Sequence, residues 1–426
     1  MTTTKNNENK KLNFSNEREQ SQACLNSAEH EKNQGRKVLN VPNLRFPEFE
    51  GEWERMRLDA FTERVMRKNK NNQSKRPLTI SAQYGLVDQI TFFNKVIAST
   101  DMSNYYLLKK GEFAYNKSYS SDYPWGAIKR LDNYDQGALS SLYICFTPQD
   151  NVVSDFILQY FESPKWHKGV SEIAVEGARN HGLLNVSVQD FFHTYHYVPK
   201  DKNEQIKISK LLMLLDERIA TQNKIIEDLK KLKVAIIEKL YSEIKGKEYS
   251  YGQLFDVVNE RNKQREYSNI LSASQEKGMV NRDDLNLDIQ FERSNINTYK
   301  IVRKGDYVIH LRSFQGGFAF SDKLGVCSPA YTILRPNSLL EYGYLSNYFT
   351  SRSFIKSLII VTYGIRDGRS INVDEWLRMK ITIPPKEHQH YIVKVIGSFD
   401  RKIESEEAYT IHLSKQKQYL LRQMFI

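Results

Sequence analysis

The chain has 426 residues, enough for two or three domains that each bury a core of their own. Its 62 Lys and Arg against 51 Asp and Glu leave a formal net charge of +11, which favours a polyanionic partner without identifying one. Three widely spaced cysteines argue against a disulfide scaffold and for a reducing, cytoplasmic setting, and no segment approaches the ~20 apolar residues of a membrane span.

Residues 1–40 are rich in Asn, Lys, Glu, Gln and Ser, with only scattered apolar residues. Such a composition buries too little surface to offset the entropy of ordering, so we expect a flexible polar tail. The texture changes at Val41, where prolines and aromatic residues up to Trp53 indicate an ordered lead-in to a first globular domain, residues 41–202.

Short strand-like runs and turn signals fill this first domain. Residues 105–116 predict two strands bent at Gly111, and residues 138–146 predict one strand. Residues 154–161 are helix-like, and residues 191–199 alternate as a strand before Pro199. The domain is therefore expected to be of the α/β or α+β class.

A long helix follows, in a spacer segment of residues 203–246. Neither Pro nor Gly interrupts Asn203–Tyr241, and helix-forming residues dominate it until Gly246. Apolar residues recur at a 4–3 spacing, as in a helix that buries one narrow seam against another helix. At ~1.5 Å per residue the helix would be roughly 55–60 Å long, which favours a spacer.

Residues 247–386 repeat the order of the first domain. Gly111 matches Gly305, and Arg179 matches Arg366, within segments 105–116 with 299–310 and 176–192 with 363–377. The glycines and turns recur while the residues between them differ. Two domains that recognise different targets would show this pattern, and neutral drift after duplication would also produce it. The net charge and the long helices favour two domains with different targets.

The helix signal returns in residues 387–426, shifted by 184 residues, so that Gln205 falls on Gln389. Even the polar breaks in the seam coincide, Gln222 with Glu406, which indicates an internal duplication. We therefore expect α/β (α+β) recognition domains in tandem duplicate, separated by two long antiparallel helices that form a coiled-coil spacer with pseudo-two-fold symmetry. The seam residues expected to pair are Leu212, Leu215, Ile219, Ile226, Leu229, Ile396, Phe399, Ile403, Leu413 and Leu420.

Three pairs of matching loops carry residues suited to DNA. Base edges are read by Arg, Lys, Asn, Gln, Ser or Thr on loops, and phosphates by nearby Lys or Arg. The residues expected to contact DNA are Lys75, Arg76, Lys117, Ser118, Tyr119, Arg130, Arg179, His181, Arg265, Arg312, Ser313, Gln315, Arg366 and Arg369.

Motifs for catalysis are missing in their usual spelling. The single Pro-Pro, Pro384-Pro385, lacks the preceding Asn or Asp and the following aromatic residue of amino-methyltransferases, and no phosphate-cradling Gly-x-x-x-x-Gly-Lys-Ser/Thr occurs. His193 and His196 lie three apart in a predicted strand and would face opposite ways, so they cannot share a metal. We expect no catalytic residue, no metal ligand and no bound cofactor.

The chain resembles the specificity subunits of type I restriction–modification systems. The match rests on the duplicated domains and on their ends, NVSVQDFFHTYHYVPKDKNEQ (185–205) and INVDEWLRMKITIPPKEHQ (371–389). Each end passes through Pro-Lys to a Gln that opens a long helix with an Asp-x-[Arg/Lys]-Ile patch, Asp216–Ile219 and Asp400–Ile403. LRFPEFEGEWE (44–54) resembles the family's lead-in. The resemblance covers residues 41–426; the polar tail is longer than the family needs.

The resemblance implies a non-catalytic subunit in which each recognition domain reads one half of a bipartite, asymmetric site on double-stranded DNA. The helices would fix the spacer and dock two methyltransferase subunits that use S-adenosylmethionine. Two translocase–nuclease subunits, dependent on ATP and Mg, would join for cleavage. The residues leave two other classes open: a stand-alone two-domain DNA-binding regulator, which would bind its operator tightly alone, and an enzyme with unrecognised motifs.

Overall fold

The computed structural model describes residues 39–82, 84–95, 99–174, 182–274, 277–284, 293–310, 317–363 and 370–426. The expected polar tail, residues 1–40, lies outside the described residues except for its last two. Contacts divide the chain into two compact units, Met1–Glu217 with Ser414–Ile426 and Arg218–Leu413, which we name unit 1 and unit 2. Each unit combines a globular part with a stretch of both long helices.

The described part of unit 1 contains three sheets, ordered β1-β10, β2-β9-β6-β7 and β4-β3-β8-β5. The strands are β1 (Glu54–Arg57), β2 (Thr62–Arg64), β3 (Pro77–Ser81), β4 (Gly85–Asp88), β5 (Tyr106–Lys109), β6 (Phe113–Asn116), β7 (Ala127–Arg130), β8 (Gln136–Leu139), β9 (Ile144–Pro148) and β10 (Tyr195–Val198). The short helices are α2 (Gln89–Phe93), α3 (Ser154–Glu162), α4 (His167–Ile173) and α5 (Val188–Phe192).

Unit 2 has the sheets β11-β22, β12-β19-β16-β17, β13-β14, β15-β18 and β20-β21 among its described residues. The strands are β11 (Lys247–Ser250), β12 (Phe255–Val258), β13 (Leu271–Ser274), β14 (Gly278–Asn281), β15 (Lys300–Val302), β16 (Tyr307–Ile309), β17 (Phe318–Phe320), β18 (Gly325–Cys327), β19 (Thr332–Pro336), β20 (Thr362–Tyr363), β21 (Ser370–Ile371) and β22 (Lys380–Ile383). The short helices are α7 (Tyr251–Leu254), α8 (Arg352–Ser357) and α9 (Val373–Arg378).

The strand order shows that the two units share one topology. The sheet β2-β9-β6-β7 of unit 1 corresponds to β12-β19-β16-β17 of unit 2, and β1-β10 corresponds to β11-β22. The parallel pairing of β3 with β8 in unit 1 returns in unit 2 as a parallel bridge between Ile270 and Val326. Gly111 and Gly305 form the same turn with φ of 87° and 98°, a conformation that glycine adopts without strain. The predicted duplication is confirmed.

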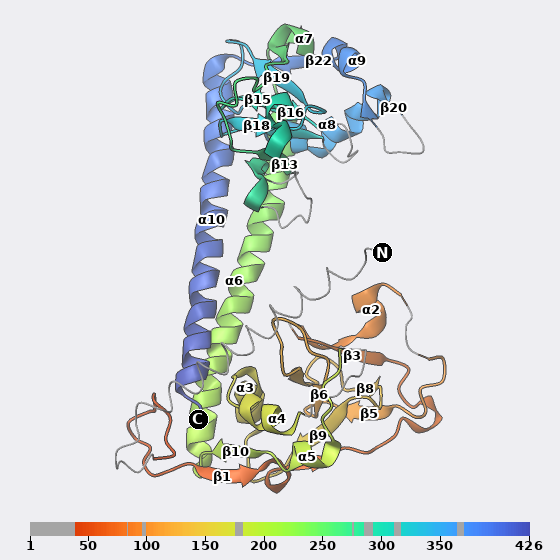
Figure 1. Ribbon diagram of the computed structural model, residues 1–426, viewed down its shortest axis with the longest axis vertical. Coiled ribbons are helices and arrows are strands. Elements are labelled where there is room, and N and C mark those ends of the chain that lie inside the picture. Colours follow the sequence, from red (N-terminus) through yellow and green to blue (C-terminus); the bar gives the residue numbers. More distant parts are fainter. Residues whose placement is uncertain are drawn as a thin grey trace. The chain divides into compact units, whose positions relative to one another are not determined.

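The two long helices, α6 (Lys202–Ser242) and α10 (Lys386–Gln423), run side by side and antiparallel (Figure 1). Every predicted seam residue of both helices is buried or half-buried. Gly246 lies four residues beyond the end of α6, after a short non-helical turn. The expected long helices are therefore present with nearly the expected ends.

Polar contacts between α6 and α10 occur in a corresponding pair, in which the donor lies on α6 in one contact and on α10 in the other. In unit 2, the Lys233 ammonium donates to the Asp400 carboxylate at 2.5 Å; in unit 1, Lys417 donates to Asp216 at 2.5 Å. These residues correspond through the shift of 184. Gln222 donates to Glu406, which is its own counterpart in the other helix. Reciprocal contacts of this kind are the local signature of the expected pseudo-two-fold relation.

A glutamine at the start of each long helix fastens that helix to its own globular part. The Gln205 side chain accepts a hydrogen bond from Val153 N at 2.7 Å and donates to Pro199 O at 2.8 Å. Gln389 accepts from Glu341 N at 2.7 Å and donates to Pro384 O at 2.9 Å. Both glutamines are 1% exposed, so water cannot reach these backbone groups to take the place of the glutamine side chain as a hydrogen-bond partner.

Gln205→Ala is expected to lower the free energy of unfolding by about 1–3 kcal/mol, because it leaves buried backbone groups without partners. Gln389→Ala should cost a similar amount in unit 2. Urea unfolding of each variant measures the loss. The control is Gln418→Ala, since the Gln418 side chain is exposed on α10; a loss there equal to that of Gln205→Ala would contradict the assignment.

The N-terminal lead-in fastens the ends of both long helices in unit 1. Arg45 forms two hydrogen bonds with the Glu204 carboxylate, at 2.7 and 2.8 Å, and Trp53 Nε1 donates to the same carboxylate at 3.1 Å. This hydrogen bonding raises the pKa of Arg45 above its ordinary value. Leu44 N donates to Gln423 O at 2.9 Å, at the end of α10.

Aromatic side chains complete this junction. The Phe425 ring packs against Phe156 and Tyr160, with ring centroids 5.4 and 5.7 Å apart. Phe425 corresponds through the shift of 184 to Tyr241, whose ring packs on Tyr344 in unit 2 at 5.6 Å. Each long helix therefore ends by placing an aromatic ring in the core of a globular part.

Two sequence predictions need correction. Residues 138–146 form the ends of two strands, β8 and β9, because Ser140–Tyr143 make a turn in which Tyr143 N donates to Ser140 O. Residues 191–199 begin in α5, since Ser187 caps that helix by accepting from Asp190 N, and only β10 is extended. The two strands bent at Gly111 and the helix at Ser154 are confirmed.

Candidate nucleic-acid interface

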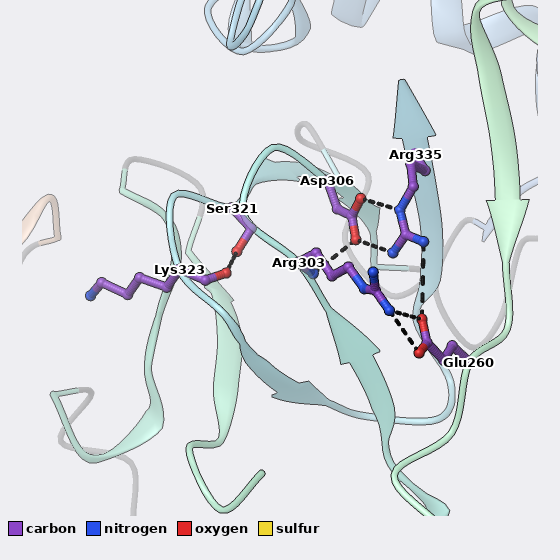
Figure 2. Close-up of polar contacts among 6 residues, drawn as sticks. All are labelled: Glu260, Arg303, Asp306, Ser321, Lys323 and Arg335. Carbon is purple, nitrogen blue, oxygen red and sulfur yellow. Dashed lines mark hydrogen bonds and ion pairs between the residues drawn. The ribbon is translucent and has the colours of Figure 1, made fainter. Parts of the chain in front are cut away.

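A buried carboxylate anchors the start of the basic loop in unit 2. Asp306, 2% exposed, accepts hydrogen bonds from Arg303 N at 2.8 Å and from the Arg335 guanidinium at 2.9 and 3.0 Å (Figure 2). Glu260 pairs with Arg303 at 2.9 Å and lies 4.0 Å from Arg335. The network ties β16 and β19 to Glu260, the residue that precedes the basic segment 261–265.

Unit 1 has a matching anchor, in which the central carboxylate is kept and the residue at the place of Glu260 has the opposite charge. Glu112, which follows Gly111 as Asp306 follows Gly305, accepts from Lys109 N at 2.8 Å and from Arg67 at 2.7 and 2.8 Å. Arg67 therefore occupies the place of Glu260. The arginines of both anchors are held by carboxylates. They therefore serve to position the start of each basic loop.

A buried asparagine then shapes each loop. Asn69 donates to Ser74 O at 2.9 Å and accepts from Ser74 N at 2.7 Å, and Asn262 bonds both backbone groups of Tyr267 in the same way, at 2.7 and 3.2 Å. Antiparallel bridges flank them, Lys68 with Tyr106 and Arg261 with Lys300. Sequence reasoning missed both asparagines, although Lys68-Asn69-Lys70 and Arg261-Asn262-Lys263 are visible as a shared tripeptide.

The predicted contacts Lys75, Arg76 and Arg265 lie on these loops, and all three side chains are exposed. Arg76 stacks on the Tyr134 ring at 4.3 Å and lies 3.6 Å from Asp88, so it has a preferred direction. Arg265 has a φ of 56°, in the left-handed region that the turn after Asn262 requires. The two loops thus present cations on a repeated, rigid frame.

A second predicted loop of unit 1 is held against the end of a third. Ser118 forms an antiparallel bridge with Leu183, and Leu184 N donates to Lys117 O at 2.9 Å. Tyr119 N donates to Gly182 O at 3.1 Å, and the Tyr119 ring is 44% exposed. The loop of Lys117, Ser118 and Tyr119 therefore meets the segment that follows Arg179 and His181.

Seven predicted contacts lie outside the described residues: Arg179, His181, Arg312, Ser313, Gln315, Arg366 and Arg369. The described residues at the ends of the two loops in unit 2 are paired. His310 N donates to Gly317 O at 2.7 Å, and β20 pairs with β21 through Thr362 with Ile371. The described residues that flank each of the two segments are therefore joined by backbone hydrogen bonds.

Arg130 has an internal role. Its guanidinium pairs with Asp132 and Asp155 at 2.7 Å each, and its side chain is 11% exposed. A guanidinium held by two carboxylates is poorly placed to read a base, so we remove Arg130 from the proposed contacts.

The two histidines considered as metal ligands, His193 and His196, lie in different environments. His196 lies in the core between Tyr160 Oη and Thr194 Oγ1, both 2.8 Å from its ring nitrogens, and burial lowers its pKa to about 3. His193 is exposed after α5. Within the described ranges, no three His, Cys, Asp or Glu side chains gather as a metal site.

None of the helices that the structure describes has the length and apolarity that crossing a bilayer requires.

Comparison with known proteins agrees with this arrangement. Residues 246–414 match the family model described as the type I restriction modification DNA specificity domain. No curated protein matches the chain in sequence.

One solved structure shares the fold at low identity, and two others align less closely. A structure titled for the assembly and conformational transition of the type I R-M system aligns with a TM-score of 0.55 at 14% identity, over 88% of this chain and 97% of that one. The type I S subunit from M. genitalium aligns with a TM-score of 0.48 at 14% identity, over 91% and 99% of the two chains. The HsdS subunit from Thermoanaerobacter tengcongensis gives 0.46 at 14% identity, over 88% and 96%. The family match is therefore confined to residues 246–414, less than half of the chain, and the likeness to a solved protein of the type I system extends to the fold.

Proposed function

We propose that the chain is the non-catalytic specificity subunit of a type I restriction–modification complex and reads a bipartite, asymmetric site on double-stranded DNA, one half with each unit. The observation that carries the proposal is the basic loop built twice on one topology, with the same bridge and the same buried asparagine. A shared frame with different exposed side chains suits two readers of different bases.

The long helices would set the spacer between the halves and dock two methyltransferase subunits. Support comes from apolar side chains that the seam leaves exposed, which is typical of surfaces that bind a partner. In unit 2, Tyr409 is 40% exposed and holds the Arg218 guanidinium 5.8 Å from its ring centre. Other exposed apolar residues of the helices include Leu214, Ile225, Leu232, Ile411 and Tyr419.

The partner subunits would supply the chemistry in the cytoplasm: S-adenosylmethionine for adenine methylation, and ATP and Mg in two restriction–translocation subunits. The chain itself would hold none of these cofactors and contribute no catalytic group. Co-expression with a methyltransferase subunit, which we expect to be encoded beside this chain, followed by sequencing of modified adenines, tests the proposal. We expect a two-part motif with a fixed spacer; a methylated motif in one piece, or methylation without this chain, would overturn it.

Arg179→Ala and Arg366→Ala are each expected to weaken specific DNA binding by about 1–3 kcal/mol, as the loss of a base contact does. Binding of the assembled complex to its mapped site, with non-specific duplex as competitor, measures the change. Arg130→Ala is the matched control, because that guanidinium is already held inside unit 1. Unchanged affinity and unchanged base preference would remove the two arginines from the interface.

A further inference from the structure

Two adjacent isoleucines protrude from unit 2 beside its predicted DNA loop. Ile359 and Ile360 are 60% and 70% exposed, on the short 3-10 helix η6 (Leu358–Val361). The residues on either side, Leu358 and Val361, are 2% and 4% exposed and belong to the core of unit 2. The pair is therefore held outward by a turn that is fixed at both ends.

Hydrogen bonds hold the turn that carries Ile359 and Ile360 in place. Thr362 Oγ1 donates to Leu358 O at 2.5 Å, and Asn372 N donates to Val361 O at 2.8 Å. Asn372 also caps α9 by accepting from Glu375 N. Single exposed apolar residues are ordinary, whereas two in a row on a braced turn form a small apolar patch that suits a partner with an apolar group to offer.

The surroundings favour duplex DNA as that partner. The strand β20 begins immediately after η6 and pairs with β21; residues 364–369, between the two strands in sequence, include the predicted contacts Arg366 and Arg369. A two-stranded ribbon fits the major groove. Arg352 and Lys356 are exposed on α8, just before η6, where cations can meet the phosphates that border a groove.

Unit 1 lacks this feature at the matching place. When Arg179 is matched with Arg366, Ile359 and Ile360 fall on Glu172 and Ile173. Glu172 is exposed and charged, and Ile173 is partly buried against the core of unit 1. A difference between units that share a frame points to what they read rather than to how they fold.

We infer that Ile359 and Ile360 contact the 5-methyl groups of thymine in the half-site that unit 2 reads. The thymine methyl is the apolar group that base pairs expose in the major groove, the same groove in which arginine reads guanine. The inference rests on the proposed function, and it makes the pair a determinant of specificity for A·T base pairs.

The test uses the complex of this chain with its methyltransferase and duplexes that carry its mapped site. Each thymine of the unit 2 half-site is replaced in turn by deoxyuridine, which removes the methyl group and keeps the base pairing. With the unchanged chain, we expect binding to fall roughly 3–10-fold at one or two positions, about the value of one buried methyl group. Ile359→Ser and Ile360→Ser should show a similar loss on thymine DNA and no further loss on deoxyuridine DNA.

Leu339→Ser is the control, since Leu339 is a 40% exposed apolar residue of unit 2 beside the start of α10; it should retain the sensitivity to deoxyuridine. The inference would be overturned if the unchanged complex bound thymine DNA and deoxyuridine DNA equally well. It would also be overturned if the serine variants lost affinity equally for both kinds of DNA and still bound deoxyuridine DNA less tightly than thymine DNA. If the only defect of the serine variants were a failure to assemble with the methyltransferase, Ile359 and Ile360 would belong to a protein–protein contact, and the inference would be overturned. A complex that methylates no bipartite site would defeat the proposed function itself.

Discussion

Exchanging residues 247–383 for the matching domain of a type I specificity protein is expected to change the bases read in one half of the proposed site and leave the other half unaltered. The structure supports these junctions because β11 and β22 close the domain, with Lys247 opposite Ile383. The exchanged segment thus begins and ends at one pair of strands, between the two long helices. Sequencing of methylated adenines measures the outcome; a change in both halves would contradict it.

The chain also offers its own donor segment. Residues 54–198 begin and end in the same way, with Glu54 of β1 opposite Val198 of β10. Inserting a copy of 54–198 in place of 247–383 should create a site whose two halves are inverted copies of each other. This variant keeps both helices unchanged, so it separates base reading from spacer length.

Glu204→Ala is expected to lower the free energy of unfolding by about 3–5 kcal/mol, the cost of leaving a buried ionic partner alone. Glu204 is 2% exposed and holds both Arg45 and Trp53, so its loss strands a guanidinium and an indole N–H. Urea unfolding followed by tryptophan fluorescence measures the effect.

His388→Ala is the matched control for Glu204, because His388 stands at the same place in α10 through the shift of 184 and its side chain is exposed. We expect it to change stability by less than about 0.5 kcal/mol. The double replacement Arg45→Met with Glu204→Met should recover much of the loss, since an apolar pair leaves no charge unpaired. Equal losses for Glu204→Ala and His388→Ala would show that the lead-in does not act through this carboxylate.

Most of the fold was predictable from periodicity. The two helices, their seam and the duplication follow from local spacing, which the sequence displays directly. The strand boundaries at 138–146 could not be read in the same way, because Ser140–Tyr143 contain no Gly, Pro, Asn or Asp to mark the turn that the chain makes there. Nor could the pairing of Arg45 with Glu204, which joins positions 159 residues apart.

The candidate interface was predictable as a set of loops and less so as residues. Charge indicated that Lys75, Arg76 and Arg265 lie on exposed loops. The same reasoning included Arg130, whose guanidinium is held by Asp132, its near neighbour in sequence, and by Asp155 of α3. Asn69 and Asn262 were overlooked because a buried amide that shapes a loop has no signature in charge or hydropathy. The contact of Ser118 with Leu183 depends on how β6 and the segment before α5 fold together.

The pairing of Gln222 with Glu406 has a consequence for mistaken assembly. In two like copies of the α10 stretch laid antiparallel in this register, Glu406 would face Glu406, and two carboxylates would be forced together. Two like copies of the α6 stretch would bring amide against amide, which is tolerated but gains no charge-assisted bond. A single carboxylate therefore favours unlike partners over like ones, so the two halves of the coiled coil select each other.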